Sequence, residues 1–428
     1  MSSADELEHS GLQRISALIS LWAFLKGKRK GILFVFSRFM EQAGIFLSIS
    51  LCGSRIGPAE MGTSIPVFLY ITYSSFLGVG GCLVLYKKYL IVNQEMRRRL
   101  CNVVYRWYLL AAFAGLFLAF VFLDRRYALL TGIIVLFTLC KSYLETICRL
   151  QQKILFVSIS DLLFASIALL GCYSFVSSFY DYLLVFAISK IAALSIYLIL
   201  QHSFVFERLQ DLFRNAVALR YYAYVLLLGA QLASITFCTT LLMTCDKFFV
   251  ARQLFDKQEQ GVYQMADTIT KISPFFINVF AVFYFPEIVK KLKLSSAMVS
   301  AYFRNMCRLF LIVPAMTVCF VIGTAIVQPR FFSAYPALPL YTGLLCFGKS
   351  CASFFLLFGY IMISQNKERK LLLYLVCCVC FLCGCYSVIA VLRSPLLYYA
   401  LSVSVLIPVL LTAFCLSLRG LMKRAGCP

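Results

Sequence analysis

Long apolar stretches dominate the chain, and each is long enough to cross a lipid bilayer as a helix. A helix needs about 20 residues to span the hydrocarbon core. Only 14% of the 428 residues are charged, whereas a soluble domain carries about 25% charged residues. The sequence therefore predicts an all-α, polytopic membrane protein with about twelve transmembrane helices. They are expected near 31–52, 62–85, 103–123, 127–148, 154–175, 180–201, 223–245, 261–285, 308–328, 337–363, 371–392 and 395–418.

The basic residues lie mostly on one side of this predicted membrane protein. The formal net charge is +22. If the N-terminus is inside, the predicted inside segments hold 26 Lys and Arg residues, whereas the predicted outside loops hold 8. Because Lys and Arg concentrate in cytoplasmic loops, both termini are predicted to be cytoplasmic. Membrane orientation accounts for the positive charge, so a nucleic-acid partner is not expected.

Two segments are predicted to lie on the membrane surface rather than to cross it. In 15–25 and in 206–220, apolar residues recur at helical spacing on one face. The second segment separates the twelve predicted spans into six and six. The predicted organisation is a cytoplasmic N-terminal tail with an interfacial helix (1–30), an N-terminal six-helix lobe (31–202), a cytoplasmic amphipathic linker (203–222), a C-terminal six-helix lobe (223–418) and a cytoplasmic tail (419–428).

The two predicted lobes carry a short internal repeat. The segment 60–62, at the start of the second span, recurs 199 residues later as 259–261, at the start of the eighth. Lys141 in the fourth span likewise corresponds to Lys349 in the tenth. Six spans per lobe give both lobes the same orientation. Parallel repeats related by a pseudo-two-fold axis are therefore predicted, an arrangement that suits alternating access around a central cavity.

Five basic residues fall inside the predicted spans. Each charge at bilayer depth costs roughly 2.5–3.5 kcal/mol on insertion scales, and such residues usually mark a substrate or ion pathway. We interpret the five as substrate-binding cations that line an electropositive cavity between the lobes, with Lys141 facing Lys349. They are Arg38, Lys141, Lys190, Lys271 and Lys349.

A structural role is the alternative for some of these charges. Three of them have an acidic neighbour on the same helix face, at a spacing that allows an ion pair. The possible pairs are Arg38–Glu41, Lys141–Glu145 and Asp267–Lys271. Lys190 and Lys349 have no acidic residue within one helical turn. These two are expected to face a water-filled cavity and to be the strongest candidates for binding an anion.

Other chemistry finds little support in the sequence. Residues 343–350 match the phosphate-loop pattern G-x-x-x-x-G-K-[ST], but they lie inside a predicted span, whereas that loop requires an exposed turn between a strand and a helix. The sequence has only two histidines, His9 and His202, and no metal-binding or hydrolytic motif. We therefore expect neither an enzyme nor a metal or other cofactor.

Short motifs at the first two spans and at the seventh and eighth spans resemble those of a known family. The residues of these motifs are Gly57, Pro58 and Gly62 of a GP-x-x-x-G loop, Asp246 and Lys247 of a D-[RK]-hydrophobic motif, and Gly261 and Tyr263 of G-x-Y-x-x-A. The motifs resemble those of the polysaccharide-transporter branch of the multidrug/oligosaccharidyl-lipid/polysaccharide exporters, and most of all those of the O-antigen (Wzx-type) flippases.

This resemblance implies a substrate and a location. The expected substrate is an undecaprenyl-pyrophosphate-linked oligosaccharide, moved from the cytoplasmic to the periplasmic leaflet of a bacterial inner membrane. Membrane lipid is then a partner, and a polysaccharide polymerase and a chain-length regulator are further expected partners. The resemblance also implies an ion gradient as the energy source, for which Glu41, Asp161 and Asp267 are the candidate coupling residues.

Three other functions are weaker explanations of the sequence. An ion-coupled small-solute or multidrug antiporter of the same superfamily predicts an acidic cavity rather than a basic one. A membrane glycosyltransferase or polymerase needs a large extramembrane loop, whereas the longest predicted loops have about 20 residues. A non-transporting scaffold gives no reason to bury lysines inside the membrane.

Overall fold

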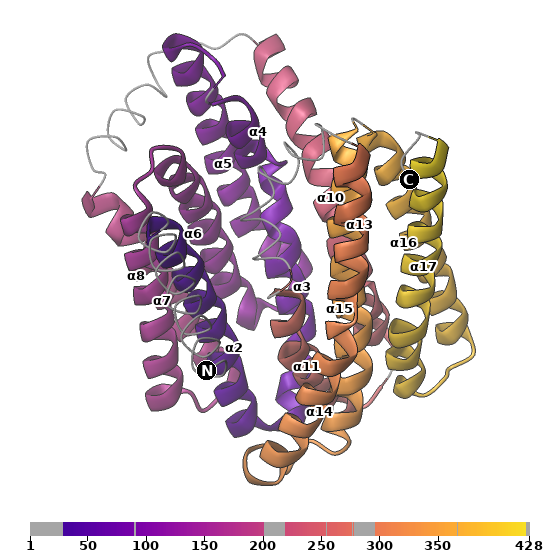
Figure 1. Ribbon diagram of the computed structural model, residues 1–428. Coiled ribbons are helices and arrows are strands. Elements are labelled where there is room, and N and C mark those ends of the chain that lie inside the picture. Colours follow the sequence, from indigo (N-terminus) through magenta and orange to yellow (C-terminus); the bar gives the residue numbers. More distant parts are fainter. Residues whose placement is uncertain are drawn as a thin grey trace, which may run out of the picture.

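The computed structural model describes residues 29–89, 91–200, 219–253, 255–275, 277, 296–365 and 367–424, and every regular element in these ranges is a helix. The prediction of an all-α chain is confirmed (Figure 1). The helices are α2 (Arg29–Thr63), α3 (Ile65–Ser74), the 3₁₀ helix η1 (Ser75–Gly78), α4 (Gly81–Lys88), α5 (Gln94–Phe122), α6 (Arg125–Leu150), α7 (Ile154–Phe175), α8 (Phe179–Leu200), α10 (Leu219–Arg252), α11 (Lys257–Thr270), α13 (Ser296–Phe310), α14 (Ile312–Phe331), α15 (Leu338–Ser364), α16 (Glu368–Val391) and α17 (Leu396–Arg424).

The helices have the length and composition of a multi-pass membrane protein. Within the described ranges, nine helices are long and apolar enough to cross a membrane, and a bent helix pair raises the number to ten. The first predicted interfacial segment, 15–25, lies outside the described residues, as do His9, His202 and all but the last four residues of the predicted linker 203–222. Those last four residues belong to α10.

The helices gather in two groups that follow the order of the sequence. In Figure 1 the indigo-to-magenta helices α2–α8 lie together on one side, and the orange-to-yellow helices α13–α17 lie together on the other. Within the groups α2 packs against α7, α5 against α6, and α15 against α14 and α17. We call α2–α8 the first lobe and α10–α17 the second lobe. The most extensive contact between the lobes is that of α2 with α11.

Glycines allow the two lobes to touch through their backbones where α2 meets α11. A methyl group added to Gly261 would lie 1.7 Å from the carbonyl oxygen of Pro58, and one added to Gly62 would lie 2.2 Å from that of Lys257. No larger residue fits at either position unless the helices move apart. The two glycines hold equivalent places in the predicted repeat, so each lobe presents the same motif to the other.

The first two predicted spans are not the straight, continuous helices that the sequence predicted. The first span was expected to end near residue 52, but α2 continues to Thr63 through a kink at Gly57, where φ is 78°. Pro58 follows the kink and cannot donate a backbone hydrogen bond, which explains why the helix changes direction there. The second span, expected to be continuous over 62–85, is instead broken between η1 and α4.

Candidate functional site: two buried ion-pair clusters

The five basic residues predicted to bind substrate fall into two groups with different partners. Within the described residues, the ion pairs of Arg38, Lys141 and Lys190 are with carboxylates of the first lobe. Those of Lys271 and Lys349 are with carboxylates of the second lobe. Each lobe thus has its own cluster, whereas the sequence predicted a single lining shared by both lobes.

The first-lobe cluster is built from four helices. Lys141 on α6 lies between two carboxylates, with its Nζ 2.7 Å from Glu41 Oε1 of α2 and 2.9 Å from Asp161 Oδ1 of α7. Lys141 and Asp161 are buried, and Asp161 is 0% exposed. A lysine that bridges two buried carboxylates ties three helices together, because separating the helices would leave buried charges without their partners. The members of this cluster are Arg38, Glu41, Lys141, Glu145, Arg149, Asp161 and Lys190.

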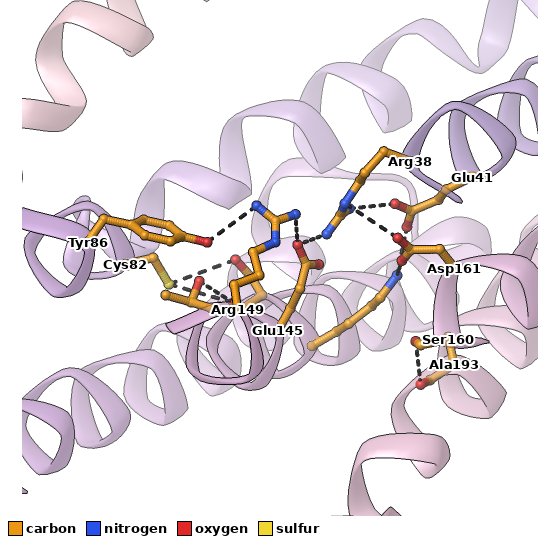
Figure 2. Close-up of polar contacts among 12 residues, drawn as sticks. Arg38, Glu41, Cys82, Tyr86, Glu145, Arg149, Ser160, Asp161 and Ala193 are labelled. Carbon is orange, nitrogen blue, oxygen red and sulfur yellow. Dashed lines mark hydrogen bonds and ion pairs between the residues drawn. The ribbon is translucent and has the colours of Figure 1, made fainter. Parts of the chain in front are cut away.

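Arg38 extends the first-lobe cluster toward Glu145, one turn after Lys141 on α6. Its Nη1 lies 2.7 Å from Glu41 Oε2, which confirms the predicted pair on α2, and its Nε lies 3.4 Å from Asp161 Oδ2. Figure 2 shows the guanidinium group of Arg38 surrounded by Glu41, Asp161 and Glu145. Glu145 also pairs with Arg149, one turn further along α6. Arg38 therefore joins the buried centre of the cluster to its more open side.

Lys190 of α8 occupies the aromatic side of the first-lobe cluster. Its Nζ lies 3.6 Å from Glu41 Oε1, 4.0 Å from the centroid of the Phe164 ring and 5.4 Å from that of Phe186. A desolvated ammonium group over an aromatic face gains cation–π stabilisation. Lys190 has no acidic residue within one turn of its own helix, and its carboxylate partner comes from α2 instead.

The second-lobe cluster is centred on Asp267 of α11. This carboxylate forms ion pairs with Lys247 of α10 and Lys349 of α15. Lys349 also lies 3.3 Å from Asp246 Oδ2, to which the Tyr263 hydroxyl donates a hydrogen bond of 2.5 Å. Lys349 likewise takes its carboxylate partners from other helices, α10 and α11. The members of this cluster are Asp246, Lys247, Tyr263, Asp267, Lys271 and Lys349.

Lys271 is the accessible member of the second-lobe cluster. Its Nζ lies 3.5 Å from Asp267 Oδ2, which confirms the predicted pair, yet 47% of its side chain is exposed. The side chains of Lys247 and Lys349, by comparison, are 2% and 3% exposed. Lys271 is therefore the cation of this cluster that reaches the surface of the described structure.

Positive charge exceeds negative charge in the second-lobe cluster. Among the described residues, this cluster has three basic and two acidic side chains. It therefore carries one surplus positive charge when all these side chains are ionised. An uncompensated charge in a medium of low dielectric constant attracts a counter-ion, and here the counter-ion would be an anion.

The motif residues serve two different parts of the structure. Asp246, Lys247 and Tyr263 belong to the second-lobe cluster, whereas Pro58, Gly62 and Gly261 form the contact of α2 with α11. Gly57 makes the kink that leads α2 into this contact. The sequence analysis named Asp246 and Lys247 through the family resemblance but did not count them among the substrate-binding or coupling residues, although an adjacent acid and base within an apolar stretch is a signal for a buried ion pair.

No protein-family model and no curated protein matches the sequence. Solved structures do match. The chain aligns with the lipid II flippase MurJ in an inward closed conformation over 91% of its own length and 87% of that chain, at 13% identity and a TM-score of 0.64. It aligns with an inward-facing multidrug resistance MATE family transporter of the MOP superfamily over 90% of its own length and 95% of that chain, at 15% identity and a TM-score of 0.58. The chain therefore shares the fold of these two solved structures.

Proposed function

We propose that the chain moves the anionic headgroup of a lipid-linked oligosaccharide across a membrane by alternating access between its two lobes. The surplus positive charge of the second-lobe cluster, with Lys271 half-exposed, carries this proposal. The likeness to MurJ, described as a lipid II flippase, supports it at the level of the fold. The proposed substrate is an O-antigen or similar repeat unit on undecaprenyl pyrophosphate, moved toward the periplasmic leaflet.

The chemistry of such a substrate fits basic side chains at membrane depth. A diphosphate carries about two negative charges, and its desolvation is costly unless cations accompany it. Charge-assisted hydrogen bonds from Lys and Arg to phosphate oxygens are stronger than neutral ones. Of the five basic residues predicted to bind substrate, Lys271 has the most exposed side chain, at 47% against 18% or less for the other four. We therefore assign the first contact with the headgroup to Lys271.

The buried carboxylates give this proposal a route to ion coupling. Glu41, Asp161 and Asp267 each hold at least one basic side chain in an ion pair. A proton or sodium ion that binds one of these carboxylates weakens its hold on that side chain, which is then free to bind an anion. Coupling in this form needs no nucleotide, and it makes the carboxylates competitors of the substrate for the same cations.

Charge reversal at Lys271 tests the proposed function. We expect Lys271→Glu in the purified full chain to weaken the binding of undecaprenyl pyrophosphate at least about tenfold, because one charged contact contributes roughly 1.5–3 kcal/mol. Lys271→Arg should retain most of the binding. Thermal stability should change little, since ion pairs of exposed side chains contribute about 0–1 kcal/mol. Native mass spectrometry of detergent-solubilised protein measures the binding.

Lys87→Glu is the matched control, because Lys87 is an exposed lysine in the last turn of α4, outside both clusters. Equal weakening by both variants would show a general effect of net charge and would count against the assigned site. Unchanged binding by Lys271→Glu would overturn it.

An ion-coupled small-solute or multidrug antiporter is the second candidate function. The buried carboxylates favour it, because a coupling cation or a cationic drug binds to acidic side chains, and the MATE likeness agrees with it at the level of the fold. This alternative predicts that Lys271→Glu strengthens the binding of a cationic dye such as ethidium and leaves the binding of polyprenyl diphosphate unchanged. The same variant thus separates the two functions.

A further inference from the structure

The second predicted span is broken near its middle, and the break lies against the other lobe. The 3₁₀ helix η1 ends at Gly78 and α4 begins at Gly81, with the two helical parts bent by 43°. The two residues between them have left-handed backbone conformations, with φ 44° at Val79 and φ 63° at Gly80. Two successive left-handed residues end one helix and start another in a new direction.

Val79 is in a conformation that its side chain disfavours. Four described residues other than glycine have positive φ, and Val79 is the only one of them with a β-branched side chain. Crowding between a branched Cβ and the backbone makes this region a true outlier for valine. Such a residue persists only where its surroundings hold it, and outliers of this kind gather at parts of proteins that switch conformation.

The backbone of α10 in the second lobe is what faces the break. A methyl group added to Gly80 would lie 2.3 Å from the carbonyl oxygen of Gly229, and one added to Gly229 would lie 2.2 Å from that of Val79. Each glycine therefore makes room for the backbone of the other lobe. The contact fixes the peptide groups of Val79 and Gly80 directly, without a side chain between them.

Side chains on both sides of the break complete this environment. Trp107 of α5 donates its indole N–H to the carbonyl oxygen of Leu77 at 3.0 Å. In a straight helix that carbonyl would accept from the N–H of Gly81, so Trp107 replaces a bond that the bend removes. On the α3 side, Tyr73 and Thr244 of α10 share a hydrogen bond of 2.5 Å. Span 2 is thus attached to both lobes around the break.

We propose that Val79–Gly80 is a hinge in span 2, held in its bent form by the backbone contact with Gly229. When α10 moves away, the contact is lost, Val79 returns to a right-handed conformation and span 2 straightens. The bend therefore reports whether the two lobes are together at the α4–α10 contact. This inference concerns the conformational change alone and does not depend on the substrate.

Two substitutions with opposite expected effects test the hinge. In the purified full chain, Gly229→Ala pushes α10 away from Val79, so we expect amides of 225–233 and 75–85 to exchange with deuterium about fivefold faster or more. Val79→Gly removes the cost of the left-handed conformation and favours the bent form, so amides of 225–233 should exchange severalfold more slowly. Hydrogen–deuterium exchange followed by mass spectrometry measures both, and no ligand is needed.

Gly384→Ala in α16 is the control, because a methyl group there meets nothing within 4 Å. A fixed kink with no hinge predicts that Val79→Gly leaves exchange across the α10 contact as in the wild type, and this result would overturn the proposal. If Gly229→Ala does not fold, Val79→Gly alone decides the question. A negative result for Lys271 would contradict the proposed function and leave the hinge standing.

Discussion

Asp267→Asn is expected to destabilise the folded protein by about 3–5 kcal/mol, the cost of breaking a buried ion pair from one side. Asp267 is buried and pairs with Lys247, Lys349 and Lys271. When Asp267 is replaced by a neutral residue, Asp246 is the carboxylate that remains in the cluster. The fraction of monomer that survives a heating series in detergent measures the loss, and we expect the survival curve to move to a clearly lower temperature.

Two further variants show whether the buried charge is responsible. Glu95→Gln makes the same kind of change in an exposed pair with Arg99 on α5, where an effect of at most about 1 kcal/mol is expected. Adding Lys247→Met to Asp267→Asn removes an unpaired cation together with its former partner, and most of the stability should return. If Asp267→Asn alone were as stable as Glu95→Gln, the idea that Asp267 holds the second-lobe cluster together would be refuted.

Gly261→Ala is expected to destabilise the contact between the lobes by about 1–3 kcal/mol, the usual effect of overpacking. The added methyl group would lie 1.7 Å from the carbonyl oxygen of Pro58, so α2 or α11 must move. The stability loss should come with faster amide exchange in 53–63 and 257–266. Gly62→Ala, placed against the Lys257 carbonyl in the other lobe, should have a similar effect.

Gly323→Ala should have the opposite effect on stability. Gly323 lies in α14 with nothing within 4 Å of an added methyl group. An alanine is favoured over glycine in a helix by about 1 kcal/mol, so this variant should be slightly more stable than the wild type. If Gly261→Ala behaved like Gly323→Ala, the close backbone contact of α2 with α11 would not exist in solution.

Sequence reasoning succeeded where the signal is local. Runs of apolar residues predict helices directly, and the pairs Arg38–Glu41 and Asp267–Lys271 follow from helical spacing. It could not identify the carboxylate partners of Lys190 and Lys349, because these partners lie on other helices. Spacing along one helix carries no information about which face of a neighbouring helix lies opposite, so these ion pairs could be found only from the packing.

The break in span 2 was missed for a different reason. Residues 78–81 contain three glycines around Val79, a local sign of an interrupted helix. An apolar run that is long enough to cross the bilayer outweighed this sign. What the sequence could not supply was Gly229, which lies about 150 residues further along the chain and fits against the break. A bend of this kind is specified by two lobes together.

The first-lobe cluster has a consequence for how the protein is made. Among the described residues, the carboxylates that pair with Arg38, Lys141 and Lys190 come from residues 41–161, within the first lobe. Domains of a growing chain generally fold as units, N-terminal first. Arg38, Lys141 and Lys190 can therefore form ion pairs while the second half is still being translated, and the first lobe need not hold these cations in the bilayer without a carboxylate until synthesis ends.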